Sequence, residues 1–298
     1  SANPFVVEAS TLSGSGFDPE AKKYEWEFAS FDGGIQGFNR DAFSVDGSGM
    51  TGADGRFYVT EASNALTLVY KTAAVWNTGD GNWSTVSQWE DSSEPEDTDN
   101  IEYVGTGGIS NNDDYITTID GLLFTSDASG AYTLKGSGLS ITLEGIINES
   151  SEKHTIELDV ELPSDQVIKT ANGSLDISGV ISGAGGLIKD GSETLTLSGT
   201  NAYSGGTTVN AGTLVGTTES LQGAISNNGT VRFDQSSDGI YAGLMSGSGD
   251  LRKSGSGKVL LSGASTHSGG TILNAGSIEV ASGSAPVSYT HLRAHETR

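Results

Sequence analysis

Residues Ser204–Gly216 read SGGTTVNAGTLVG, and residues Ser268–Val280 read SGGTILNAGSIEV. Both stretches place two glycines before a short apolar run that ends in Asn-Ala-Gly. Glycine supplies positive φ angles and asparagine tolerates the left-handed region, so these residues predict sharp corners. The corner positions are Gly205, Gly206, Asn210, Gly212, Gly269, Gly270, Asn274 and Gly276. Neither copy contains an obvious catalytic group, and we therefore interpret the repeat as a building unit rather than a site.

The repeat extends beyond these corners. When Gly179 is placed on Gly243, residues 179–216 align with residues 243–280 without a gap, and 18 of the 38 aligned pairs are identical. Apolar positions are preserved by type, as where Leu214 matches Ile278. Short strands joined by fixed corners favour a coil that stacks on itself, because one turn cannot bury its apolar stripe alone. A β-sandwich also uses short strands, but here the same corner recurs in the same phase.

The predicted fold class is therefore all-β: a right-handed parallel β-helix, or solenoid, preceded by a smaller β-rich unit. With turns of about 20 residues stacked about 4.8 Å apart, one period of the sequence repeat is expected to make about three turns. On this interpretation Asn210 and Asn274 recur in register, as in an asparagine ladder. Residues Thr155–Leu162 (TIELDVEL) fit an earlier turn, since apolar and acidic residues alternate there.

Composition shifts divide the chain into four segments. We expect residues 1–72 to be the β-rich end of a preceding module and residues 73–100 a Trp-rich, acidic cap segment. Residues 101–286 are expected to form the β-helical repeats. Residues 287–298 (VSYTHLRAHETR) lack Gly corners and strand alternation, and they resemble translated sequencing-adapter read-through. We exclude this tail and its His291 and His295 from the fold, and expect the sequence to be an internal fragment.

Three tryptophans fall close together in the cap segment: Trp76, Trp83 and Trp89. Such a group either plugs the open end of a β-stack or forms a platform on which sugars stack, and we favour the plug. The six acidic residues between Glu90 and Asp99 are expected to form a solvated loop.

The charge of the chain limits its partners. A net charge of −23 repels a phosphate backbone, so nucleic acid is not an expected partner. The acidic surface keeps an exported protein soluble, while Ca²⁺ binding is a sharper alternative that carboxylates allow. No cysteine is present, which excludes disulfides and thiolate metal sites. No run of 18 apolar residues is present either, so no helical membrane span is predicted.

Candidate catalytic groups are few. His267 aligns with Tyr203 and is therefore not expected to be a base, and His154, among polar residues, is expected to be exposed. The stretch Ser254–Val259 (SGSGKV) lacks the flanking residues of a phosphate loop. Polysaccharide cleavage needs carboxylates that converge on one face. The candidate acids, which do not recur at turn spacing, are Asp113, Asp114, Asp120, Asp234 and Asp238. We therefore predict that the segment is not an enzyme.

Two stretches carry a resemblance to a known family: WNTGDGNWSTVSQWED (residues 76–91) and GSETLTLSGTNAYSGGTTVNAGTLVG (residues 191–216). They resemble the autotransporter-associated β-strand repeat, also called the passenger-associated transport repeat. The resemblance is specific over residues 176–280. It implies a β-helical passenger segment of a large secreted or surface-exposed bacterial protein, with no catalytic residues to carry over.

The resemblance further implies a location at the cell surface or outer membrane, with membrane attachment only through a C-terminal barrel or anchor. Our expected function is a structural stalk that supports export and display. The alternative is an adhesin-type module that binds glycans or other cells, for which Tyr203 and Tyr241 are the only aromatic candidates. A lyase or hydrolase on a β-helix ranks third. No cofactor is expected apart from the Ca²⁺ alternative.

Overall fold

The computed structural model divides the chain into two compact units, residues 1–73 and 74–298. It describes residues 5–8, 23–30, 43–46, 56–62, 65–71, 73–76, 79–90, 95, 99–113 and 115–281. The expected tail 287–298, Asp114 and most of the acidic run after Glu90 lie outside the described residues.

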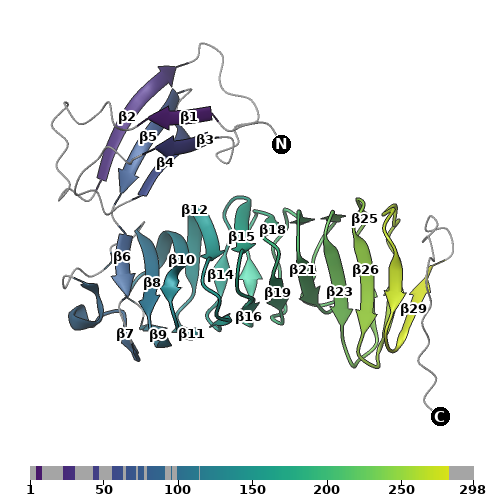
Figure 1. The fold of residues 1–298 in the computed structure, drawn as a ribbon. Coiled ribbons are helices and arrows are strands. Elements are labelled where there is room, and N and C mark those ends of the chain that lie inside the picture. Colours follow the sequence, from purple (N-terminus) through teal and green to yellow (C-terminus); the bar gives the residue numbers. More distant parts are fainter. Residues whose placement is uncertain are drawn as a thin grey trace. The chain divides into compact units, whose positions relative to one another are not determined.

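The first unit contains two small sheets (Figure 1). Strand β5 (Ala65–Lys71) lies between β2 (Lys23–Ser30) and β4 (Arg56–Ala62) and pairs with both in antiparallel fashion. Strand β1 (Phe5–Glu8) pairs in parallel with β3 (Phe43–Asp46). Val59 and Leu68 are register partners and both are buried, so alternation along β4 and β5 sets the buried face.

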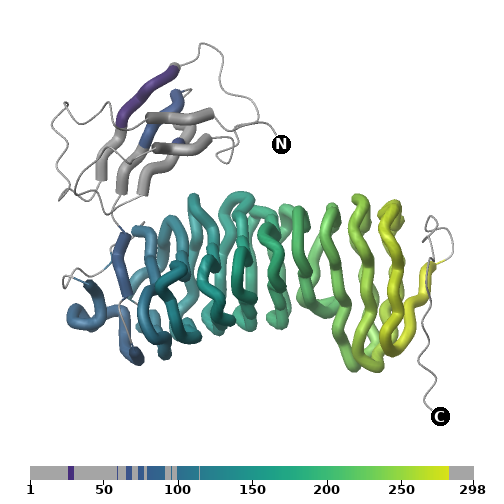
Figure 2. The backbone as a smooth tube through the Cα atoms, viewed as in Figure 1, coloured from purple at the N-terminus to yellow at the C-terminus, as the bar shows by residue number. Residues whose placement is uncertain are grey.

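The second unit is a β-solenoid of about nine turns, and the all-β, parallel β-helical fold class is confirmed. Figure 2 shows its backbone as a coil in which successive turns lie side by side. Each turn passes through three faces. The first face consists of β6 (Ala73–Trp76), β8 (Asn100–Gly105), β10 (Thr118–Ala128), β12 (Leu139–Asn148), β15 (Gln166–Thr170), β18 (Leu187–Asp190), β20 (Thr207–Val209), β22 (Ile225–Asn227) and β25 (Met245–Ser246).

The other two faces complete each turn. The second face consists of β7 (Gly81–Asn82), β9 (Gly108–Asn112), β11 (Tyr132–Gly136), β13 (His154–Ile156), β16 (Leu175–Ile177), β19 (Thr194–Leu197), β21 (Thr213–Gly216), β23 (Thr230–Asp234), β26 (Asp250–Ser254) and β28 (Thr271–Leu273). The third face contains β24 (Gly239–Tyr241), β27 (Lys258–Leu261) and β29 (Ser277–Val280), which form one sheet. In earlier turns this part of the chain holds β14 (Val160–Glu161) and β17 (Ile181–Ser182), which pair with each other and join the first sheet through β12.

Alternating side chains fill the interior of the coil. Ile156, Leu158, Val160 and Leu162 are all buried, as the alternation in TIELDVEL predicts, whereas Glu157, Asp159 and Glu161 are exposed. The segment is not one strand, however. It turns a corner between β13 on the second face and β14 on the third, and its alternation continues through the corner.

The sequence repeat and the coil have different periods. Strand register joins Leu187 to Thr207, Thr207 to Ile225 and Ile225 to Met245, so three turns lead from Leu187 to Met245. One sequence repeat leads further, from Leu187 to Leu251, so it makes slightly more than the three turns that lead to Met245. The extra residues carry the chain onto the next face: Leu187 lies in β18 on the first face, while Leu251 lies in β26 on the second.

The expected asparagine ladder is wrong for the same reason. Asn210 follows β20 on the first face and Asn274 follows β28 on the second, and both side chains are exposed. The same corner is thus built twice, on different sides of the coil.

Candidate functional site

The three tryptophans of the cap segment fill the first turn from inside. Trp76 and Trp83 are fully buried and Trp89 is 3% exposed. Trp89 packs edge-to-face on both other rings, with centroids 5.0 Å from Trp76 and 6.0 Å from Trp83. Trp83 Nε1 donates to Ser110 Oγ (2.6 Å), and Trp89 Nε1 donates to the Trp83 carbonyl (2.9 Å). None of the three indole faces is open to a sugar ring.

The aromatic column continues into the next turns and ends at His154. The His154 ring stacks on the Phe124 ring at a centroid distance of 4.1 Å and an interplanar angle of 10°. His154 is fully buried, so the expectation that it is exposed is wrong. The physical reason is strand alternation: His154 and Ile156 lie two residues apart in β13 and share the inward face.

The bonding of His154 leaves no lone pair for catalysis. The Tyr132 N–H donates to Nδ1 (3.0 Å), so the proton of the neutral ring lies on Nε2, which bonds Ser150 Oγ (2.7 Å). Ser150 Oγ in turn donates to Asn148 Oδ1 (3.0 Å). Burial lowers the pKa of His154 to about 4. This Ser–His contact is therefore a structural link and not a nucleophile–base pair.

Polar side chains line the interior corner between the first and second faces, and each donates a hydrogen bond to a carbonyl of the following turn. We call this set the corner ladder: Asn148 to Ser174 (3.1 Å), Thr170 to Glu193 (2.9 Å), Lys189 to Ala211 (3.2 Å) and Asn227 to Asp250 (2.9 Å). Buried carbonyls left without a donor would cost free energy, so the corner ladder joins successive turns at a place where strand pairing is interrupted.

Lys189 is the charged member of the corner ladder. It is fully buried, and its Nζ also donates to the carbonyls of Asp190 (2.7 Å) and Gly191 (2.8 Å). Burial lowers the pKa of Lys189 to about 8, against the opposing effect of the nearby carboxylates of Asp190 and Glu193. Lys253, its equivalent in the second repeat, is also fully buried and donates to Gln235, Ser254 and Gly255.

The predicted corner positions match in part between the two copies: Gly212 and Gly276 share a positive φ, whereas Gly206 has one and its counterpart Gly270 does not. Gly212 and Gly276 have φ angles of 66° and 71°, and Gly206 has 84°. A Cβ on Gly205 would lie 2.3 Å from Gly186 N, and one on Gly269 would lie 2.1 Å from Gly249 O. The backbone N–H groups of Asn210 and Asn274 donate to Lys189 O and Lys253 O, both at 2.9 Å. The Gly270 N–H donates to Asp250 Oδ1 (3.0 Å).

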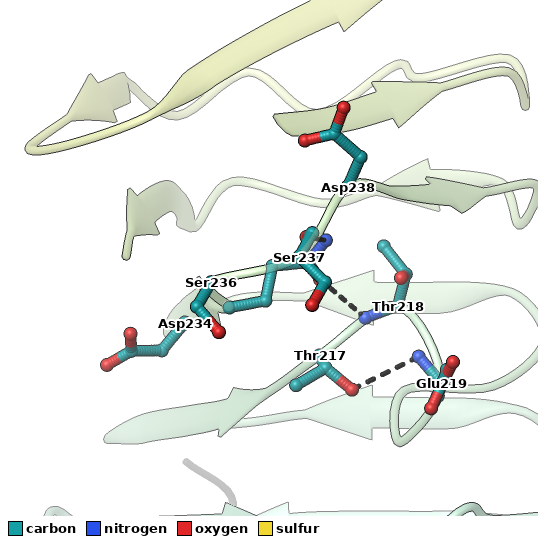
Figure 3. A pocket seen from close by; sticks show the side chains of 8 residues that line it. Thr217, Thr218, Glu219, Asp234, Ser236, Ser237 and Asp238 are labelled. Carbon is teal, nitrogen blue, oxygen red and sulfur yellow. Dashed lines mark hydrogen bonds between the residues drawn. The ribbon is translucent and has the colours of Figure 1, made fainter. Parts of the chain in front are cut away.

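Two of the candidate acids, Asp234 and Asp238, border one polar pocket of about 250 Å³ together with Glu219. Figure 3 shows the three carboxylates pointing in different directions. Asp238 Oδ1 accepts a hydrogen bond from the Lys258 N–H (2.8 Å), and Gln235 Oε1 accepts one from the Thr218 N–H (2.9 Å). The pocket is thus a gap between turn loops whose acids do not converge on one point.

The other acids lie on distant turns. Asp113 accepts hydrogen bonds from the backbone N–H and hydroxyl of Ser84, and Asp120, in β10, bonds the Thr142 hydroxyl (2.8 Å). Strand β10 is separated from β23 by several turns, so Asp120 does not share a site with Asp234. Within the described residues, no group of three or more His, Cys, Asp or Glu side chains is arranged to hold a metal ion.

Comparison with known proteins agrees with this architecture. The family model described as the passenger-associated-transport-repeat matches residues 187–215 and 251–280. These residues are passenger-associated transport repeats. The two matches begin at Leu187 and Leu251, so the family's unit starts with the strand that contributes Lys189 or Lys253.

A curated relative of these repeats is an adhesin autotransporter, BmaC, of Brucella suis biovar 1 (strain 1330). It is 32% identical over 174 residues, which cover 47% of this chain but only 5% of the relative's own length. No solved structure matches the chain. The chain therefore carries repeats of the autotransporter passenger type, and autotransporter passengers are bacterial and surface-exposed or secreted.

The repeat position occupied by Tyr203 and His267 is internal. Tyr203 is 3% exposed and its hydroxyl bonds Thr207 Oγ1 (2.8 Å), while His267 Nε2 bonds the equivalent Thr271 Oγ1 (3.3 Å). Tyr241 is also buried, so the two tyrosines offer no outward aromatic row. Among the described residues, no helix is long and apolar enough to cross a membrane.

Proposed function

We propose that this passenger segment is a rigid, non-enzymatic spacer that holds a distal functional region away from the bacterial outer membrane. The continuity of the coil supports the proposal most directly. Parallel pairing runs from turn to turn on the first two faces, and the corner ladder adds interior links. With about nine turns at about 4.8 Å each, the solenoid spans about 43 Å.

The absence of enzymatic activity is part of this proposal. The described histidines are buried and hydrogen-bonded. Of the candidate acids, Asp234 and Asp238 border one pocket but point in different directions, and Asp113 and Asp120 lie on distant turns. Neither arrangement supplies a general acid and base on the two sides of a scissile bond.

The spacer is also proposed to need no cofactor, including Ca²⁺. The turns are already joined by hydrogen bonds between protein groups, and Asp238 and Asp250 use carboxylate oxygens to bind backbone N–H groups. On this proposal a chelator leaves the thermal midpoint unchanged, whereas a drop of several degrees on chelation would restore the Ca²⁺ alternative.

An adhesin-type function is the second candidate, because the curated relative is named as an adhesin. Its partners would be glycans or other cells. The net charge of −23 disfavours nucleic acid. Contact with the membrane itself would come through an anchor or barrel elsewhere in the protein.

The spacer proposal is tested by inserting residues 74–281 between an epitope and the membrane anchor of a surface-displayed protein. We expect the epitope to move outward by about 40 Å with a narrow distribution, measured by energy transfer to a membrane dye. Removing residues 187–244, which are three turns in phase, is expected to shorten the distance by about 14 Å. A Gly/Ser linker of equal residue number is the matched control, and a distribution as broad as that of the linker would contradict a rigid spacer.

A further inference from the structure

Two arginines lie side by side on the outer surface of the second face. Arg232 in β23 and Arg252 in β26 are register partners on adjacent parallel strands. Neighbouring strands lie about 4.8 Å apart, so two positive charges are held close together in a chain whose net charge is −23. Such a pair repels itself unless an anion lies between or above the two guanidinium groups.

The hydrogen-bonding capacity of this pair is largely unused. The Nε atoms of Arg232 and Arg252 are both buried and have no hydrogen-bond acceptor. Within the described part of the chain Arg232 makes no ion pair, and Arg252 makes one, Nη2 to Asp250 Oδ2, at 3.7 Å. The Arg252 side chain is 44% exposed, so a ligand from solvent can reach it.

The neighbouring carboxylates take the role of that anion only in part, since Asp250 pairs with Arg252 alone, at 3.7 Å. Asp250 already accepts the Gly270 N–H through Oδ1. Asp234 borders the pocket of Figure 3, and its carboxylate points away from the other acids there. The arginine pair therefore lies between two acids without being closed off by either of them.

The surface beside the pair carries hydroxyl groups. Thr213 and Thr230 are register partners on β21 and β23, and Thr230 precedes Arg232 by two residues on the same side of its strand. Val215 is the register partner of Arg232 and is only 4% exposed although it faces outward. Of its two neighbours along this row, Thr196 and Arg232, only the arginine is long enough to cover it.

We propose that Arg232 and Arg252 form a binding site for the carboxylate of a uronic-acid glycan of low charge density. A guanidinium group binds a planar carboxylate with two parallel hydrogen bonds, and the threonine hydroxyls can bond sugar hydroxyls beside it. The net charge of −23 repels dense polyanions such as nucleic acid, so the ligand carries widely spaced carboxylates. This inference rests on the adhesin-type candidate and is independent of the spacer proposal.

The test uses the full chain and a hyaluronate octasaccharide, with titration calorimetry at low and at physiological salt. We expect binding that weakens with salt and that is lost for the carboxyl-reduced octasaccharide. Arg232→Gln with Arg252→Gln is expected to weaken binding at least about tenfold. Lys169→Gln removes one positive charge from the outside of the first face, away from the arginine pair, and it is expected to leave the affinity unchanged from that of the wild-type chain.

A second pair of variants separates charge from geometry. Arg232→Lys with Arg252→Lys keeps both charges and most of the cover over Val215, but removes the bidentate fork, and is expected to weaken binding severalfold while the fold is retained. Wild-type binding no stronger to the octasaccharide than to its carboxyl-reduced form would overturn the proposal. So would a double Gln variant that is folded by circular dichroism and binds like wild type. Neither result would affect the spacer experiment, which measures distance.

Discussion

Lys189 and Lys253 occupy the same position in two sequence repeats and both are fully buried, yet they lie on different faces of the coil. Each ammonium group donates to three backbone carbonyls. The sequence repeat therefore preserves a local capping device, while the direction in which the repeat faces changes from copy to copy.

Lys189→Met is expected to destabilise the solenoid by about 2–4 kcal/mol, because three carbonyls lose a charged donor inside the protein. Lys253→Met should have an effect of similar size, although it lies on another face. Lys169→Met, on the outside, should stay within about 0.5 kcal/mol. Urea unfolding followed by far-UV circular dichroism measures all three, and equal small effects would show that the buried ammonium groups are dispensable.

Gly212→Ala tests the tight corners. Gly212 has a φ of 66°, and an added Cβ would lie 2.4 Å from Gly191 O. Gly79 has a similar φ of 79° but open space around its Cβ position, so Gly79→Ala isolates the backbone term, about 1–2 kcal/mol. We expect Gly212→Ala to lower the free energy of unfolding by clearly more than Gly79→Ala does, in the same urea measurement. Equal losses would mean that close stacking adds nothing at this corner.

Acid is expected to destabilise the solenoid through His154. Burial lowers the pKa of His154 to about 4 from 6.5, so between these pH values the unfolded chain binds a proton that the folded chain does not. Stability should therefore be unaffected by this group above pH 6.5 and fall by up to about 1.4 kcal/mol per pH unit below it, down to about pH 4.

The pH experiment needs a control for the second buried histidine. Burial also lowers the pKa of His267, and His267→Tyr removes this titration while restoring the residue found at Tyr203. In the His267→Tyr background, His154→Gln should flatten the remaining dependence of the free energy of unfolding on pH between pH 6.5 and 4. A slope that persists unchanged would assign the acid sensitivity to the carboxylates instead.

Trp83→Ala is expected to cost about 3–5 kcal/mol and to loosen the first turns, because the indole ring is fully buried and its Nε1 bonds Ser110. Amide hydrogen exchange in the variant should be accelerated relative to wild type in β7 and β9, and much less so in β26. Val86→Ala, at a position 41% exposed, is the matched control. Soluble sugars should leave tryptophan fluorescence unchanged, and saturable quenching by a sugar would favour the stacking platform.

Local conformation was the part of this fold most accessible from the sequence. Gly212 and Gly276 adopt the positive φ angles that their corners require, and the alternation around Leu158 identifies buried residues correctly. These features depend on a few neighbouring residues. The alternation also contained the signal for His154: continued back by one step from Ile156, it places the imidazole inside.

The phase of the coil was not accessible in the same way. Turn length depends on the summed lengths of three strands and three corners, and the steps from Leu187 to Thr207 and from Thr207 to Ile225 already differ in length. The self-similarity of the two copies carries no information on those lengths. For the same reason, the pairing of Arg232 with Arg252 emerges only once the strand register is known.

The change of face between copies has a consequence for multivalency. A receptor that recognised the outer side of one repeat would find the equivalent side of the next copy facing another direction, because the two copies are rotated relative to each other about the solenoid axis. A flat array of receptors could then engage only one of the two copies at a time, and avidity is lost when geometry forbids simultaneous engagement. Repetition of this kind therefore stabilises the solenoid without adding avidity for such a receptor.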